Sequence, residues 1–102
     1  MYHNDVPRFA WDISKEAINL RLHGVGFALA AQAVLDRHRL ELFDLDHSDE
    51  EDRWTIIGMA GSVPVVLRVT ISEEDDKEII RIISARRANA AQRNLYFKQR
   101  KI

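Results

Sequence analysis

The sequence predicts an α+β fold with two N-terminal helices, an antiparallel β-meander sheet and a C-terminal helix. Two helical segments with capping signals occupy residues 12–38. Three apolar or alternating stretches follow at residues 53–59, 63–71 and 78–86, and the loops between them are short enough for antiparallel pairing. A chain of 102 residues supports one hydrophobic core, so residues 1–102 are expected to form a single domain.

The first helix is marked at both ends. Residues 8–11 are typical of a short strand, and Asp12 suits an N-cap because its carboxylate can accept hydrogen bonds from the free amides of a first turn. The helix is expected to run to about His23, and Gly24 supplies the left-handed residue that ends it. One stripe of this helix carries the apolar residues Ile13, Ala17 and Leu20.

The second helix is expected at residues 26–38, and a strand at residues 39–45 follows it. Helical spacing turns five of its side chains inward, namely Phe27, Ala30, Ala31, Val34 and Leu35. The acidic residues after this strand are expected to form a loop. Asn89 then caps the terminal helix, with Gln92 as its capping-box partner. The helices are expected to cover one face of the sheet and to leave the other at least partly open.

Composition is ordinary for a globular protein, but the charges are unevenly distributed. The chain is 46% hydrophobic and 30% charged, contains no cysteine and has no apolar run long enough for a membrane span, so a cytoplasmic protein is expected. The net charge is −1, yet residues 41–52 hold seven acids, and residues 81–102 hold seven lysines and arginines with no acid. A basic C-terminal third favours an anionic partner, with phosphate the usual candidate.

Arginines recur through the predicted meander. Strict alternation puts Arg81 and Arg86 on opposite faces of the last strand, so one of them is expected on the helix-covered side. Arg68 lies in the preceding strand, and Arg53 begins the first. Guanidinium groups are permanently charged and match phosphate oxygens, so this set suits a phosphodiester. The alternative is a series of local ion pairs with the acids Glu51, Asp52 and Glu78.

The terminal helix carries Arg93, Tyr96 and Arg100 at a spacing that forms one stripe. An aromatic ring between guanidinium groups suits a nucleic-acid strand, through stacking and phosphate contacts, although a solvated face with a tyrosine at its margin is the commoner case. The region around His47 is rich in oxygen ligands, but it lacks the glycine and glutamate of a calcium loop. We therefore expect no metal site and no cofactor.

Three stretches together resemble the BrnT family of toxins from bacterial type II toxin–antitoxin modules. They read "FAWDISKEAINLRLHGVGF", "DLDHSDEEDRWTIIG" and "IRIISARRANAAQRNLY", in the family's order. Leu22 stands where the family usually has lysine. The resemblance implies a fold similar to the RelE/ParE toxins and a metal-independent endoribonuclease that cleaves RNA, inhibits translation and arrests growth. It also implies a cognate BrnA-type antitoxin, through which alone operator DNA would be bound.

The resemblance and the residue chemistry together give a set of expected site residues. The catalytic residues are expected to be Arg86, Arg53, Arg81, Glu51, His47, Tyr96 and His23. In this scheme the arginines stabilise charge on the phosphorane, Glu51 or His47 is the base, and Tyr96 or His23 is the acid. The expected substrate-binding residues are Arg68, Arg87, Arg93 and Arg100. The rival hypotheses are a non-catalytic module that binds an antitoxin or nucleic acid, and a gyrase-poisoning toxin of similar fold.

Overall fold

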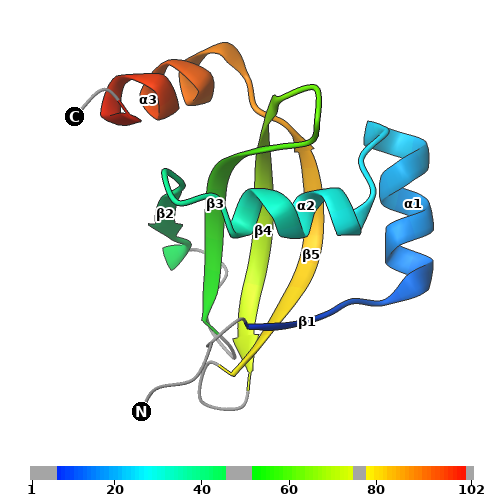
Figure 1. Ribbon diagram of the computed structural model, residues 1–102. Coiled ribbons are helices and arrows are strands. Elements are labelled where there is room, and N and C mark those ends of the chain that lie inside the picture. The colour runs from blue at the N-terminus through cyan, green and yellow to red at the C-terminus, as the bar shows by residue number, and fades with distance from the viewer. Residues whose placement is uncertain (1–6, 46–51, 75–77, 101–102) are drawn as a thin grey trace.

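The computed structural model describes residues 7–45, 52–74 and 78–100, which form a five-stranded sheet and three helices (Figure 1). The α+β class is confirmed. None of the helices in these residues is long and apolar enough to cross a lipid bilayer. The elements in chain order are β1 (Arg8–Ala10), α1 (Ile13–His23), α2 (Phe27–Val34), β2 (Leu40–Phe43), β3 (Arg53–Ala60), β4 (Val65–Glu74), β5 (Ile79–Arg87) and α3 (Ala90–Arg100).

The strand order in the sheet is β1-β5-β4-β3-β2. The expected meander is confirmed, because β3, β4 and β5 pair with one another in antiparallel fashion. Two short strands extend it: β2 pairs antiparallel with β3, and β1 pairs parallel with β5. β4 continues to Glu74, three residues beyond the expected strand end, so Ser72 belongs to the sheet and not to a loop.

The ends of α1 follow the capping chemistry of the sequence. The Asp12 carboxylate accepts hydrogen bonds from the amides of Ser14 and Lys15, and Gly24 adopts a left-handed φ of 70° while its amide donates to the Leu20 carbonyl. The apolar stripe of this helix is not buried, however, and Ile13 remains 78% exposed. α1 lies beside the edge of β5 and does not cover the sheet (Figure 1).

Asn19 is the buried residue of α1, and it joins the helix to β5. Its Nδ2 donates to the carbonyls of Val25 and Ala85, both at 2.8 Å, and its Oδ1 accepts from the Ala85 amide at 3.1 Å. The amide side chain therefore takes the place of a neighbouring strand at this point of the β5 edge. Such a side chain satisfies backbone groups that would otherwise be buried without partners.

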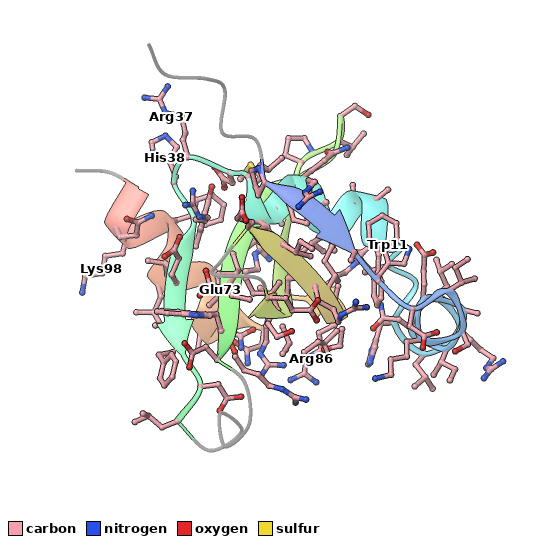
Figure 2. The ribbon with its side chains drawn as sticks, turned by 90° about the horizontal axis from the view of Figure 1, so that it is seen from below. Trp11, Arg37, His38, Glu73, Arg86 and Lys98 are labelled. Carbon is pink, nitrogen blue, oxygen red and sulfur yellow. The ribbon has the colours of Figure 1, made fainter. Side chains whose placement is uncertain are left out.

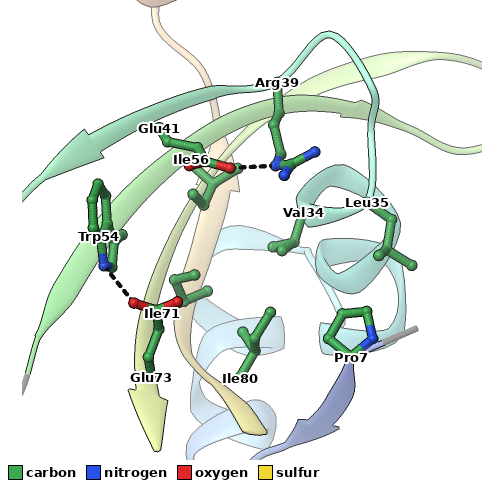
Figure 3. Close-up of a pocket in the computed structure, with 10 residues that line it drawn as sticks. All are labelled: Pro7, Val34, Leu35, Arg39, Glu41, Trp54, Ile56, Ile71, Glu73 and Ile80. Carbon is green, nitrogen blue, oxygen red and sulfur yellow. Dashed lines mark hydrogen bonds and ion pairs between the residues drawn. The ribbon is translucent and has the colours of Figure 1, made fainter. Parts of the chain in front are cut away.

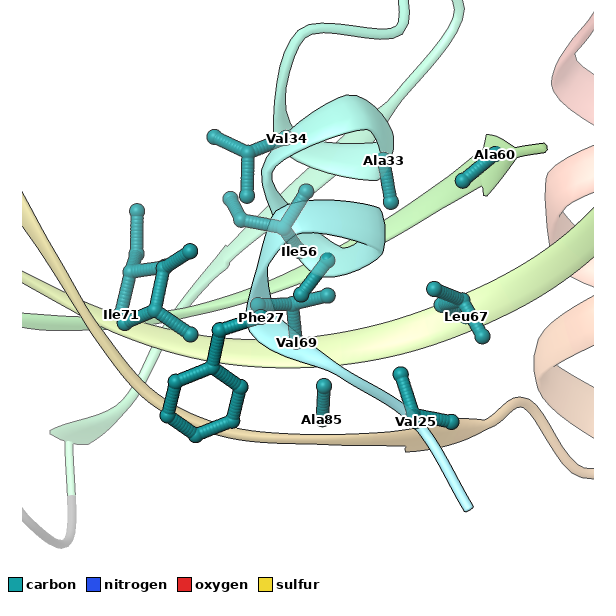
Figure 4. Packing of buried hydrophobic residues seen from close by; sticks show 12 residues of the cluster. Val25, Phe27, Ala33, Val34, Ile56, Ala60, Leu67, Val69, Ile71 and Ala85 are labelled. Carbon is teal, nitrogen blue, oxygen red and sulfur yellow. The ribbon is translucent and has the colours of Figure 1, made fainter. Parts of the chain in front are cut away.

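The main core lies between α2 and the sheet (Figures 1 and 4). The buried residues of α2 are Phe27, Ala30, Ala33 and Val34. The expected inward set was therefore wrong at Leu35, which is about half exposed, whereas Ala31 is partly buried and packs against the core. The helix also ends at Val34, four residues earlier than the sequence suggested, which leaves one end of the sheet face uncovered.

α2 approaches the sheet closely at Gly58. A Cβ atom added to Gly58 would lie 2.2 Å from the Ala33 carbonyl oxygen, so this position in β3 has no room for any side chain. Neighbouring backbone atoms cannot move aside as a flexible side chain could. The Gly58–Ala33 contact thus fixes how near the helix can pack.

α3 makes a smaller cluster on the opposite face of the sheet. The capping box is confirmed, because Asn89 and Gln92 exchange hydrogen bonds between side chain and backbone. Tyr96 is 1% exposed and packs with Ile57 and Val66. Its hydroxyl donates to Asp36 Oδ2, and the same carboxylate accepts from the backbone amides of Met59 and His38.

Substituting Gly58 with alanine should destabilise the fold, because the new methyl group would displace the α2 backbone. We expect Gly58→Ala to lower the free energy of unfolding by about 2 kcal/mol or more. Gly26→Ala is the matched control, since its added Cβ would meet only side-chain atoms at 3.6 and 3.8 Å. Urea denaturation of both variants measures the difference, and equal losses would contradict the close approach.

Removing the Tyr96 hydroxyl should weaken the fold in a pH-dependent way. Burial alone would raise the pKa of Asp36, but the hydrogen bonds from Tyr96, His38 and Met59 outweigh it, and the net pKa is lowered. Ionised Asp36 therefore stabilises the folded chain above the unfolded-state pKa of about 3.9, and this stabilisation is lost as the pH falls through the lower folded-state pKa.

Tyr96→Phe should consequently cost about 1–2 kcal/mol near pH 7. The difference from the parent chain should begin to shrink below about pH 4, where the carboxylate of the unfolded chain becomes protonated, and should vanish as Asp36 is protonated in the folded chain at lower pH. Thermal or urea unfolding across this pH range measures it. In an Asp36→Asn background the same change should cost less, and an equal cost in both backgrounds would show that the two side chains are not coupled.

Candidate functional site

A β-bulge at Ile83 determines which side chains of β5 point to which face. Thr70 of β4 pairs with Ser84, but the next residue, Ile71, pairs with Ile82. β5 therefore uses two residues where β4 uses one, and Ile83 is the extra residue. Side-chain alternation resumes with opposite phase beyond such a bulge.

The bulge corrects the expected placement of the arginines. Ile82 and Ala85 are both 1% exposed in the core beneath α2, although they are three residues apart and strict alternation would separate them. Arg81 and Arg86 pair with Ser72 and Arg68 of β4, so they share the face that α2 does not cover. The prediction that they lie on opposite faces was wrong.

Four arginines thus lie on one face of the sheet, which we call the arginine face. It comprises Arg53, Arg68, Arg81 and Arg86, with the hydroxyl residues Thr55, Thr70 and Ser84 in a row between the two pairs. Figure 2 shows Arg86 projecting from the sheet on the side opposite α2. Guanidinium and hydroxyl groups on a pleated surface present many hydrogen-bond donors to an oxyanion.

Arg68 and Arg86 are direct cross-strand partners of the same charge. Partial burial lowers the pKa of Arg68, the positive charge of Arg86 lowers it further, and Asp44 offsets part of the effect. Like charges directly opposite each other are unfavourable in a sheet. An anion that bound both guanidinium groups would relieve this repulsion.

The arginines differ in how far they are engaged by acids. Arg81 Nε donates to Glu74 Oε2 at 2.6 Å, a partner that the sequence analysis did not include. Arg53 is engaged as well, and its carbonyl accepts a hydrogen bond from the Asp44 amide. Arg86 is exposed, and within the described ranges its side chain forms no hydrogen bond or ion pair. Arg86 is therefore the guanidinium on this face most open to a ligand.

The residue between Arg53 and Arg81 is buried, so a ligand has no access to the middle of this row. Ser72 lies between them in β4 and is 0% exposed, and its hydroxyl has no hydrogen-bond partner among the residues described. A ligand cannot reach this hydroxyl without displacing the side chains above it. The accessible end of the arginine face is consequently the Arg68–Arg86 row.

Other expected site residues lie away from this face. The Tyr96 hydroxyl is buried against Asp36, which gives it a structural contact instead of a position beside the arginines. His23 is exposed at the end of α1. Arg87 and Arg93 line a separate pocket beside α3. Glu51 and His47 lie outside the described residues, and so does the side chain of Arg100.

Two residues near the arginine face were missed by the sequence analysis. Asp44 follows β2, its amide continues the pairing with β3, and its carboxylate acts on Arg68. The acidic segment was recognised, but nothing in it distinguished Asp44 from six neighbouring acids. Asn19 fixes the backbone of Ala85, the residue before Arg86, and an asparagine inside a helical segment was the only available signal.

The sheet face beneath α2 holds a pocket of about 590 Å³ beside the end of that helix (Figure 3). Its walls are mainly apolar, and its charged groups are already paired: Arg39 with Glu41 at 2.7 Å, and the Trp54 indole with Glu73 at 3.0 Å. None of the four arginines lines it. No group of three or more metal-ligating side chains comes together anywhere in the described ranges.

Comparison with known proteins places the chain in a family. A search of curated proteins gives no match to it. The family model described as "Ribonuclease toxin, BrnT, of type II toxin-antitoxin system" matches residues 11–92, which include α1 and α2, all of the antiparallel strands and the first turn of α3. The chain therefore belongs to the BrnT family of ribonuclease toxins of type II toxin–antitoxin systems.

Proposed function

We propose that this protein is a metal-independent endoribonuclease whose arginine face binds the scissile phosphate of RNA. The observation that carries the proposal is the placement of four arginines on the sheet face opposite α2, with the Arg86 side chain exposed and making no hydrogen bond or ion pair among the described residues. Family membership supports ribonuclease activity in general. The placement of the four arginines supports the arginine face as the surface that binds and cleaves RNA.

The proposed reaction is an internal transfer within RNA. A base takes the proton of the ribose 2′-hydroxyl, the 2′-oxygen attacks the adjacent phosphorus, and the P–O bond to the 5′-oxygen breaks as an acid protonates that oxygen. The products are a 2′,3′-cyclic phosphate and a 5′-hydroxyl. Negative charge grows on the non-bridging oxygens in the transition state, and donors already in position stabilise that charge most strongly.

Arg86 and Arg68 are assigned to the non-bridging oxygens. Burial lowers the pKa of Arg68 most, and the positive charge of Arg86 lowers it further; this mutual repulsion is relieved as negative charge develops between the two groups. Arg53 and Arg81 add positive potential from the next row but are already engaged. This ordering makes Arg86 the residue on which the chemical step depends most.

The base and the acid are assigned to residues other than the arginines. Asp44 is the described carboxylate that acts on Arg68, so we propose it as a base candidate beside Glu51 and His47. Because the Tyr96 hydroxyl is held by Asp36, we assign the acid role to His23. His23 ends α1 one turn after Asn19, whose side chain holds the backbone next to Arg86.

In the cell, cleavage of RNA by this face would inhibit translation and arrest growth. A cognate BrnA-type antitoxin would neutralise the toxin by covering the cationic surface, because a partner of complementary charge both steers to such a surface and blocks it. Operator DNA would then be bound through the antitoxin only. The type II classification of the family supports the existence of an antitoxin.

Arg86→Ala tests the assignment directly. The purified protein should cleave single-stranded RNA in the presence of a metal chelator and leave cyclic phosphate ends. Arg86→Ala should lower kcat/KM by about 100-fold or more, the loss typical for one oxyanion donor. Arg86→Lys should restore only part of the rate, because an ammonium group lacks the planar fork.

Lys98→Ala is the control, since it removes one exposed positive charge from α3 at a position distant from Arg86 (Figure 2). It should cleave like the parent chain, and unfolding curves should show that all variants are folded. Near-native activity of Arg86→Ala would remove Arg86 from the site. Intact RNA after incubation with the parent chain would favour a non-catalytic binding module.

A further inference from the structure

A cationic pocket that includes none of the four arginines of the arginine face lies where β5 passes into α3. Its volume is about 260 Å³, and its lining includes Arg87, Arg93, Phe97, Met59, Val66 and Pro64. α3 rises beyond the end of the meander at this position (Figure 1). The pocket is thus bounded by sheet on one side and by the start of the helix on the other.

The two arginines of this pocket are not neutralised locally. Arg87 and Arg93 are exposed, and no carboxylate lines the pocket. Within the part of the chain that the structure describes, neither side chain makes an ion pair or a hydrogen bond. Two guanidinium groups beside an apolar wall form a site for an anion that also has an apolar or aromatic part.

The backbone on both sides of the pocket is fixed. Arg87 pairs with Leu67 in the sheet, and the Ala88 amide continues the pairing by donating to the Val66 carbonyl at 3.0 Å. Arg93 lies just after the Asn89–Gln92 capping box, where its amide donates to the Asn89 carbonyl at 2.9 Å. The backbone positions of both arginines are therefore set before any ligand arrives, so binding orders only their side chains.

The aromatic wall is also held in place. Phe97 is partly exposed and lies almost perpendicular to the ring of Tyr96, with centroids 5.2 Å apart. Tyr96 is itself anchored by Asp36. Any of the four nucleobases can pack against such a ring, because every base has a π-face.

We propose that this pocket binds one nucleotide of single-stranded RNA next to the scissile phosphate. Phe97 and the apolar wall contact the base, while Arg87 and Arg93 contact its phosphate. Val66 of the pocket lies two residues from Arg68 on the same face of β4, a step of about 6.8 Å and so of the order of one nucleotide unit. The inference rests on the proposed RNA substrate and extends it by a base-binding subsite.

The test measures binding without cleavage. The probes are a single-stranded 2′-O-methyl oligonucleotide of mixed sequence, which lacks the attacking hydroxyl, and an abasic oligomer of the same length. Dissociation constants are measured by fluorescence anisotropy at several salt concentrations. The variants are Arg87→Gln, Arg93→Gln and Phe97→Leu, and Lys98→Gln is the control because it makes the same charge change on α3 outside the pocket.

Each arginine variant should bind both probes about tenfold more weakly and lower the salt slope by about one. Phe97→Leu should weaken binding of the base-containing probe about tenfold and leave the abasic probe unchanged. Lys98→Gln should bind both probes like the parent chain. In cleavage assays the pocket variants should raise KM with kcat nearly unchanged.

The subsite is overturned if the arginine variants behave like Lys98→Gln, or if Phe97→Leu reduces affinity for both probes equally. It is also overturned if a polyglutamate peptide, and not the oligonucleotide, loses affinity in the arginine variants, because the pocket would then be a protein-docking site. If Phe97→Leu weakens binding of the base-containing probe alone and the parent chain does not cleave RNA, the subsite is kept and the proposed ribonuclease reaction is rejected. If the parent chain cleaves RNA and the pocket variants bind both probes like the parent chain, the reaction is kept and the subsite is rejected.

Discussion

The arrangement of this protein depends on one extra residue in β5. With Ile83 bulged out of the ladder, Ile82 and Ala85 both enter the core beneath α2, and Arg81 and Arg86 both leave it. A regular strand could not place both Ile82 and Ala85 in the core, because its side chains alternate between the two faces. It would either bury a guanidinium group beneath a helix, where the cost of removing charge from water is large, or take an isoleucine out of the core. The cationic surface and the hydrophobic core are thus fixed by the same local irregularity.

The two faces of the sheet have different tasks as a result. The face beneath α2 holds most of the buried apolar area, and the contact between Gly58 and Ala33 shows how tightly the helix is seated. That packing allows the other face to hold cross-strand arginines that repel each other. Asp44 offsets part of this repulsion at Arg68, and Glu74 pairs with Arg81 in the neighbouring row. Such local destabilisation is common where a protein must bind a ligand of opposite charge.

The local sequence was sufficient to predict the helices and strands, but not which face of the sheet each side chain lies on. Asp12, Gly24 and the Asn89–Gln92 pair act through backbone hydrogen bonds a few residues away, so their roles could be predicted from the sequence alone. The bulge could not be predicted, because every residue from Ile82 to Ala85 is apolar or small and suits either phase of the strand. Tyr96 was misplaced for a different reason, since helical spacing grouped it with exposed arginines and its partner Asp36 is 60 residues away.

The bridge between Asn19 and Ala85 also bears on how the molecules behave toward one another. A sheet edge with free amides and carbonyls can recruit a strand from another copy, and repeated recruitment leads to aggregates. Here β1 occupies the first residues of β5, and one side-chain amide occupies the backbone at Ala85. A single polar residue thereby occupies backbone groups of β5 that β1 leaves unpaired, a protection against self-association that a hydrophobic substitute of equal size would not provide.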